Sequence, residues 1–388
     1  MLYNLAASYG GFYDEVVHAI ESLQLTPYRL ESYRKTKDAE VEKTIQRQEA
    51  LVGIFKTTFL KRLESSVKAF ETSIRDQMEF QTGLLQHLKE RGRLLGAADF
   101  RRTKQLVKSE DDDRLARAQD VIESLDEVDR EAYKLSEIQS HVEADVSSLT
   151  GILEALNTLT DCGNQDAKLD EVKGFIRKRL ASSLKERKLL LFTYFRETAE
   201  YIYKAITDDK AWIREMGTPR IEIITGNTDG ERRSTIVRQF APFSNRPQEE
   251  EREGWQPPAD QIDILISTDV LSEGQNLQDC GDLLNYDLHW NSVRMIQRAG
   301  RINRLKALHD LVYVYNCYPD KELNNLLRIV ERLQQRVRDI DQSVALDHSV
   351  MGEIISDKSF DQLRRIREWD AQVIDELEQQ AELGTVDS

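Results

Sequence analysis

The stretch that decides the fold covers residues 262–304 and reads IDILISTDVLSEGQNLQDCGDLLNYDLHWNSVRMIQRAGRINR. It contains two apolar runs of strand length, 262–266 and 283–286, each followed by polar residues or a helical piece. Its last part is a predicted helix in which arginine recurs every three or four residues, at Arg294, Arg298, Arg301 and Arg304. Strands that alternate with helices and end in polar residues are typical of open α/β sheets, which bind ligands at the carboxyl ends of their strands.

The arginine-rich helix indicates the chemistry of the ligand. From His289 to Lys306 there are basic side chains and no acidic ones, although the whole chain carries a formal net charge of −15. The planar guanidinium group suits phosphate oxygens. Gly300 inside the helix costs roughly 1 kcal/mol relative to alanine, which suggests that something approaches closely there. A phosphate site is one interpretation of this pattern, and a solvated basic face is the other.

The region around this stretch predicts an α/β domain. Five apolar runs of strand length alternate with helical segments, at 189–195, 220–226, 262–267, 283–286 and 311–315. This alternation predicts a mostly parallel sheet with helices on both faces. The loop 243–260, rich in proline and charge, is expected at the surface.

A large all-α region is predicted ahead of that domain. No proline occurs between Pro27 and Pro219, and apolar residues recur at helical spacing over 41–74 and 115–142. The charged run 101–113 is expected to be a loop between antiparallel helices. The expected domains are short helices at 1–40, which would be the tail of a missing first lobe, a long-helix insertion domain at 41–185, a lobe at 186–320, and C-terminal helices with an acidic tail at 321–388.

Composition excludes several classes of function. The negative net charge argues against a protein that coats nucleic acid through a general basic surface, although a local basic groove remains compatible. The three cysteines, Cys162, Cys280 and Cys317, are too far apart for a disulfide framework or a zinc site, which fits a cytoplasmic protein. No signal peptide and no apolar run long enough to cross a membrane is visible. The scattered histidines predict no metal site.

The motifs resemble those of superfamily-two helicases and translocases. QRAGRINR at 297–304 looks like motif VI, and STDVLSEGQNLQ at 267–278 looks like motif V. KLLLFTYFRET at 188–198 resembles motif IV, IITG at 223–226 resembles the short motif that follows it, and NYDLHWN at 285–291 resembles a Swi/Snf segment. The resemblance implies a second, RecA-like lobe of a Swi/Snf-like enzyme, preceded by that family's helical insertion.

The resemblance also implies roles for individual residues. Arg301 and Arg304 would be arginine fingers that stabilise the charge on a transferred phosphoryl group. Gln297 and Arg298 would position that helix and bridge to the other lobe, while Gly274, Gln275 and Asn276 would lie near ribose and phosphates, with Asn276 standing where DEAD-box members have aspartate. The sugar-phosphate backbone of a nucleic acid would be contacted by Thr193, Arg196, Gly226 and Thr268. The pair His289-Trp290 would be structural or would line the nucleic-acid path.

A complete enzyme of this class also needs a G-x-x-x-x-G-K-[ST] loop and an acidic pair for magnesium. The chain has no Gly-Lys dipeptide, and Asp126-Glu127 lies within a predicted helix rather than at a strand end. The expectation is therefore the C-terminal half of an ATP-dependent DNA translocase, in which ATP and Mg are held mainly by a missing N-terminal lobe, in cis or in trans. Its partner would be double-stranded DNA. The alternative is a non-catalytic adaptor with a vestigial lobe.

Overall fold

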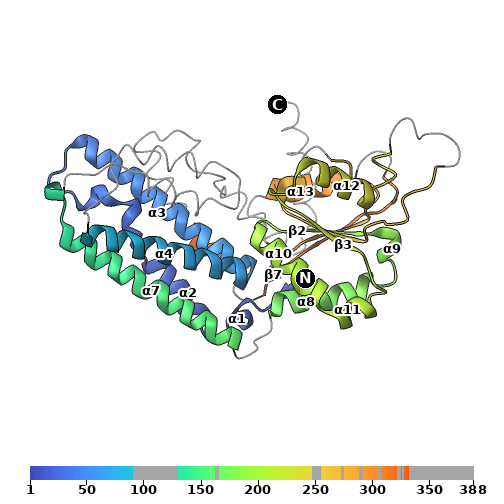
Figure 1. The fold of residues 1–388 in the computed structure, drawn as a ribbon, viewed down its shortest axis with the longest axis horizontal. Helices are drawn as coiled ribbons and strands as arrows, with labels where there is room; N and C mark the ends of the chain where they lie inside the picture. The colour runs from blue at the N-terminus through green and yellow to red at the C-terminus, as the bar shows by residue number, and fades with distance from the viewer. Residues whose placement is uncertain are drawn as a thin grey trace. The chain divides into compact units, whose positions relative to one another are not determined.

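The computed structural model describes residues 1–90, 130–161, 166–246, 255–271, 275–287, 292–303, 307–320, 325 and 327–331 (Figure 1). These residues fall into two compact units. The first, here called the α/β lobe, contains residues 1–5 and 166–320. The second, the helical unit, contains residues 6–90, 130–161, 325 and 327–331. The division falls close to residue 165, whereas the sequence analysis places the corresponding boundary between 185 and 186.

The α/β lobe is built on a five-stranded sheet in the order β3-β4-β2-β5-β6. Every pair of neighbouring strands is parallel. The strands are β2 (Leu189–Phe192), β3 (Ile221–Ile224), β4 (Ile264–Ser267), β5 (Asp282–Asn285) and β6 (Tyr313–Asn316). The α/β fold class and the predicted parallel sheet are thereby confirmed, with strand ends that differ from the predicted ones by at most three residues.

Helices cover both faces of this sheet. They are α10 (Arg196–Asp208), α11 (Lys210–Glu215), α12 (Gly230–Phe240) and α13 (Ser292–Ile302). Figure 1 shows α12 and α13 on one face and α10 and α11 on the other. Leu190 and Phe192 pack in one core cluster with Phe240 of α12. Because successive side chains of a strand point to opposite faces, the equally buried Leu189 and Leu191 face the α10 side.

The first residues of the chain also belong to the α/β lobe. Strand β1 (Leu2–Tyr3) pairs in parallel with β7 (Tyr318–Pro319), and the Met1 ammonium group donates to the Asn316 carbonyl at 2.6 Å. The lobe resumes with α8 (Ala167–Phe175), a π-helical turn (Ile176–Leu180) and α9 (Leu184–Arg187), which leads into β2. Strand β1 is not anticipated by the sequence analysis, which describes residues 1–40 as short helices only.

The helical unit consists mainly of long helices that pack on one another. They are α1 (Leu5–Ser8), α2 (Tyr13–Ser22), α3 (Ala39–Ser65), α4 (Val67–Glu90) and α7 (Leu135–Asp161), with 3-10 turns at Thr26–Tyr28, Leu30–Tyr33 and Arg130–Ala132. Helices α3 and α4 meet at Ser66, whose extended backbone ends the first helix. The Ser66 hydroxyl accepts from the Ala69 amide at 3.1 Å and so caps the second helix. The run 101–113 and most of the stripe 115–142 lie outside the described residues.

A buried carboxylate joins three parts of the helical unit. Asp145 of α7 accepts from the amides of Gln24 and Leu25, both at 2.7 Å, and from the Gln81 side chain of α4 at 3.1 Å. Leu25 has a left-handed backbone, with φ of 49°. The carboxylate therefore fixes a turn that a leucine would not adopt by itself. Burial raises the pKa of Asp145 above its ordinary value, although its hydrogen bonds oppose this shift.

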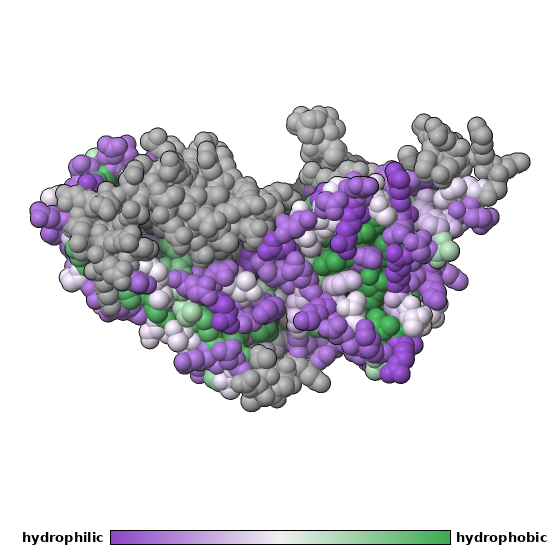
Figure 2. All heavy atoms as spheres, viewed as in Figure 1, coloured by the Kyte–Doolittle hydropathy of each residue, from purple (hydrophilic) through white to green (hydrophobic). Residues whose placement is uncertain are grey.

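The surface is mostly polar on the side shown in Figure 2, where hydrophilic residues cover most of the described atoms and hydrophobic ones show in narrower areas between them. The described helices include none with the length and apolar character that a membrane crossing requires. Of the expected C-terminal helices at 321–388, only residues 325 and 327–331 are described, and they are helical.

Candidate nucleotide and nucleic-acid interface

The residues that the motifs single out follow the carboxyl ends of neighbouring strands. Thr193 follows β2, Gly226 lies two residues after β3, and Thr268 follows β4. Because all five strands are parallel, these ends meet at one edge of the sheet, where α/β folds bind their ligands. The sequence-predicted residues 193, 226 and 268 are thus brought to a single edge by the fold.

Arg298 holds helix α13 against this edge. Its Nε and Nη2 atoms each lie 2.7 Å from Asp269 Oδ1, just beyond β4, and its Nη1 donates to Asn285 Oδ1 of β5 at 2.9 Å. The guanidinium group also lies 4.8 Å from the centre of the Phe192 ring. Arg298 is fully buried. In this structure it acts as a clamp between α13 and two strand ends, and it is not exposed to a ligand, so its nucleotide contact stays a prediction.

The outer side of α13 carries the other predicted residues. Gln297 is exposed and Arg301 is partly exposed, one helical step beyond the clamped Arg298. A Cβ atom built on Gly300 would meet nothing within 4 Å. No crowding inside the chain therefore requires glycine at this position, which leaves room for a group that approaches from outside. Arg304 lies outside the described residues, so the second predicted finger is not placed.

The predicted nucleic-acid contacts differ in how accessible they are. Gly226 is exposed and Arg196, at the first position of α10, is partly exposed. Thr193 and Thr268 are buried. The Thr193 hydroxyl donates to Asp287 at 2.5 Å, so it is engaged within the lobe rather than presented at the surface. Direct contact between the Thr193 side chain and a nucleic acid would require this hydrogen bond to be exchanged.

The segment that resembles motif V is tied to the chain that follows α12. The Asn276 carbonyl accepts from the Asn245 side chain at 2.7 Å. Asp279 accepts from the amides of Phe243 and Ser244 at 2.8 and 2.9 Å. Gln275 is partly exposed and Asn276 is exposed, as a ribose or phosphate contact would need. Gly274 and the pair His289-Trp290 lie outside the described residues.

A buried cluster beside the same edge was missed by the sequence analysis. Asp287 follows β5 by two residues and accepts from Thr193, from the Tyr194 amide and from Lys168. Burial raises the pKa of the neighbouring Tyr286 well above its ordinary value. The position of a polar residue shortly after an apolar strand was a signal that could have pointed to Asp287. Nothing in the local pattern pointed to Lys168, which is 119 residues away.

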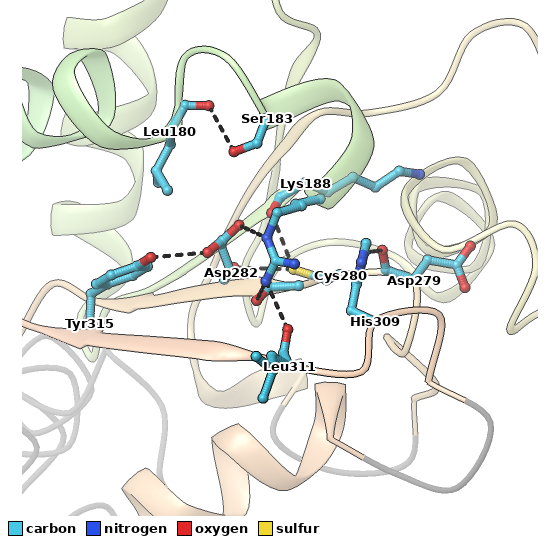
Figure 3. A network of polar contacts seen from close by, with 11 residues as sticks. Leu180, Ser183, Lys188, Asp279, Cys280, Asp282, His309, Leu311 and Tyr315 are labelled. Atoms are coloured by element: carbon cyan, nitrogen blue, oxygen red, sulfur yellow. Dashed lines mark hydrogen bonds and ion pairs between the residues drawn. The ribbon is translucent and has the colours of Figure 1, made fainter.

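The opposite edge of the sheet is closed by its own polar network (Figure 3). Arg187 Nε lies 2.9 Å from Asp282 Oδ2, and its Nη2 donates to the carbonyls of Gly281 and Leu311. Tyr315 donates to the other Asp282 oxygen at 3.1 Å (Figure 3). These contacts join the beginnings of β2, β5 and β6. The predicted residues Thr193, Gly226 and Thr268 follow the other ends of their strands, at the carboxyl edge.

The described residues fit one part of a nucleotide site. Arg301 and Gln297 stand on the outer side of a helix with open space above Gly300, which suits a phosphoryl group approaching from outside. Among the described side chains no group of three or more histidine, cysteine, aspartate or glutamate residues could hold a metal ion. Bound ATP and Mg would supply the phosphoryl group and the countercharge for its transfer.

Comparison with known proteins defines the class. A family model described as "Helicase conserved C-terminal domain" matches residues 167–306, which include the carboxyl ends of β2, β3, β4 and β5. Together with the five-stranded parallel sheet, this match shows that the α/β lobe is a C-terminal helicase lobe with a RecA-like fold.

Individual relatives are similar over short parts of their length. The uncharacterized ATP-dependent helicase YqhH of Bacillus subtilis is 51% identical over 55 residues, which are 14% of this chain and 10% of that protein. The ATP-dependent RNA helicase DBP2 of Chaetomium globosum is 24% identical over 174 residues, 45% of this chain and 26% of that protein. The chain thus spans about a quarter or less of the length of these curated relatives.

Two solved structures complete the comparison. The C-terminal part of the Fun30 ATPase domain has a TM-score of 0.42 and 14% identity, covering 94% of this chain and 96% of that chain. Dbp5 of S. cerevisiae, bound to RNA and ADP BeF3, has a TM-score of 0.29 and 16% identity, covering 46% of this chain and 42% of that chain.

Proposed function

We propose that this chain supplies the second lobe of an ATP-dependent, Swi/Snf-like DNA helicase or translocase that works in the cytoplasm. Its α13 helix provides arginine fingers, and the carboxyl edge of its sheet provides contacts to the nucleic-acid backbone. ATP and Mg are held mainly by a first lobe with a G-x-x-x-x-G-K-[ST] loop, which this sequence does not contain. The DNA preference rests on the resemblance of the motifs, since the relative DBP2 is named an RNA helicase.

The observation that carries the proposal is the clamp on α13. A helix that merely displayed a solvated basic face would not bury Arg298 completely between Asp269 and Asn285. A buried ion pair is a poor source of stability compared with apolar packing, but it fixes geometry. Here it holds α13 against the sheet, and the exposure of Gln297 and partial exposure of Arg301 on the same helix support a ligand contact by both. Preorganised cations of this kind stabilise charge that develops on a transferred phosphoryl group.

The test is to combine the full chain with a Walker A lobe encoded beside it and to measure ATP hydrolysis. We expect Arg301→Ala to reduce turnover by on the order of 10³-fold or more, while binding of a fluorescent ATP analogue changes little. Arg238→Ala is the matched control, because Arg238 is an exposed arginine in the last turn of α12. Turnover of the Arg301 variant within a few-fold of wild type would contradict the finger assignment.

The same assay distinguishes the nucleic acid and the alternative function. Duplex DNA, single-stranded DNA and RNA are added separately, and we expect duplex DNA to stimulate hydrolysis most. Stronger stimulation by RNA would contradict the DNA assignment, but it would still support an ATP-dependent helicase or translocase. If no lobe with a Walker A loop is encoded nearby and the chain binds neither nucleic acid nor nucleotide, the non-catalytic adaptor replaces the proposal.

A further inference from the structure

The carboxylate of Asp287 gathers three donors from two separate segments of the α/β lobe. Its Oδ2 atom accepts from the Thr193 hydroxyl at 2.5 Å and from the Tyr194 amide at 2.6 Å. Its Oδ1 atom lies 3.3 Å from Lys168 Nζ. Hydrogen bonds to an ionised acceptor are shorter and stronger than neutral ones, and the two bonds to Oδ2 have such lengths. The chain after β2 is thus held by the residue that follows β5.

The cation of this pair is enclosed as completely as the anion. The side chains of Lys168 and Asp287 are each 3% exposed. Lys168 Nζ lies 5.0 Å from the centre of the Tyr3 ring and 4.5 Å from that of Tyr286, so the ammonium group is between aromatic faces. Burying a lysine here is costly unless it is paired. Apolar side chains of the same size would pack with less desolvation, so stability alone does not explain this pair.

The pair fixes the turn from which α10 starts. Phe195 is the N-cap residue of α10 and makes no side-chain capping hydrogen bond, and Arg196 is the first residue of the helix. The amide of Tyr194, immediately before that cap, is the one that Asp287 holds. The direction in which α10 presents Arg196 therefore depends on a bond made by a residue from another strand.

We propose that Lys168 and Asp287 are a positioning pair for nucleic-acid binding: by fixing the turn 193–194 they set the place of Arg196 on the backbone of the bound strand. This inference rests on the proposed function, because it assumes that Arg196 contacts a phosphate. Thr193 then acts through Asp287, as a buried donor that holds the turn, rather than through a phosphate contact of its own hydroxyl.

The experiment measures binding of labelled duplex DNA by the full chain at a series of salt concentrations. The slope of log K against log salt reports the number of phosphate contacts. We expect Arg196→Ala to reduce the slope by about 1. Lys168→Met combined with Asp287→Leu, which removes the acceptor and leaves no unpaired buried charge, is expected to reduce the slope by the same amount although neither residue is exposed. Adding Arg196→Ala to this double variant is expected to cause no further reduction.

Two further variants separate positioning from folding. Thr193→Val, which removes the donor, should reduce the slope, and Thr193→Ser, which keeps it, should not. Circular dichroism and the urea midpoint establish that each variant is folded. A folded Lys168/Asp287 double variant with the wild-type slope would overturn the inference, as would a full additional loss on adding Arg196→Ala. A wild-type chain whose binding shows no salt dependence, or an Arg196→Ala variant with an unchanged slope, would instead overturn the proposed nucleic-acid contact.

Discussion

Replacing Arg298 by methionine tests the clamp directly. The change removes two 2.7 Å contacts with Asp269 Oδ1 and the 2.9 Å bond to Asn285, whose side chain is buried. Loss of one partner of a buried ion pair costs about 3–5 kcal/mol, because the desolvated charge that remains has lost its counterion. With a urea dependence of roughly 2 kcal/mol per M, the unfolding midpoint of the lobe should fall by about 1.5–2.5 M.

Tryptophan fluorescence reports this transition selectively. All four tryptophans lie outside residues 6–164, and Trp212 of α11 is buried in the α/β lobe. Arg238→Met on the exposed side of α12 is the control and should shift the midpoint little, as surface substitutions usually do. The double variant Asp269→Asn, Arg298→Met should be less destabilised than the sum of the two single variants. An unchanged unfolding midpoint in Arg298→Met would refute the clamp. So would a double variant whose loss of stability equals the sum of the losses in the two single variants.

Further predictions concern two glycines and one carboxylate. Gly281→Ala should destabilise the lobe by about 1–3 kcal/mol, because its Cβ would lie 2.8 Å from Arg187 Nη2 and from a His309 ring carbon, whereas Gly300→Ala should stabilise the isolated chain by up to about 1 kcal/mol. Urea unfolding followed by fluorescence measures both changes. An unchanged unfolding midpoint in Gly281→Ala would contradict the close packing of Arg187 and His309 around Gly281. Because burial raises the pKa of Asp145, its contribution to the stability of the helical unit is fully present below the unfolded pKa, about 3.9, and is lost as the pH rises through the raised folded pKa. Unfolding followed by circular dichroism should therefore show that wild type is more stable than Asp145→Asn by a margin that shrinks between pH 3.5 and pH 7. A margin that grows over this range would contradict a raised pKa of Asp145.

The sheet was predictable because its strands are buried on both faces and read as continuous apolar runs. Leu189–Phe192 and Ile264–Ser267 are fully buried along their length, as parallel strands covered by two helix layers must be. The arginine spacing of α13 likewise predicted a functional helix. It did not predict that Arg298 would be buried and Arg301 partly exposed, although a step of three residues rotates by about 60° and allows that difference.

What the sequence could not supply is pairing between distant residues. Lys168 and Asp287 each look like ordinary surface charges in their own segments, and only the fold places them together. Thr193 illustrates the same limit. The local sequence does not distinguish a polar side chain that faces a ligand from one that bonds a residue after a neighbouring strand, as Thr193 does with Asp287. The two-residue strand β1 is too short to leave any periodic pattern, and its partner lies near the other end of the lobe.

Strand β1 also has a consequence for how the chain is made. Its pairing with β7 joins Leu2 to Tyr318 and Tyr3 to Pro319, and the Met1–Asn316 hydrogen bond beside it spans 315 positions. Domains generally fold as units during synthesis, with N-terminal parts first. Residues 6–161 of the helical unit can therefore be synthesised while Leu2–Tyr3 still lacks its partner strand. Residues 2–3 would then be among the last of the α/β lobe to reach their final position, since pairing at such a large sequence separation slows folding.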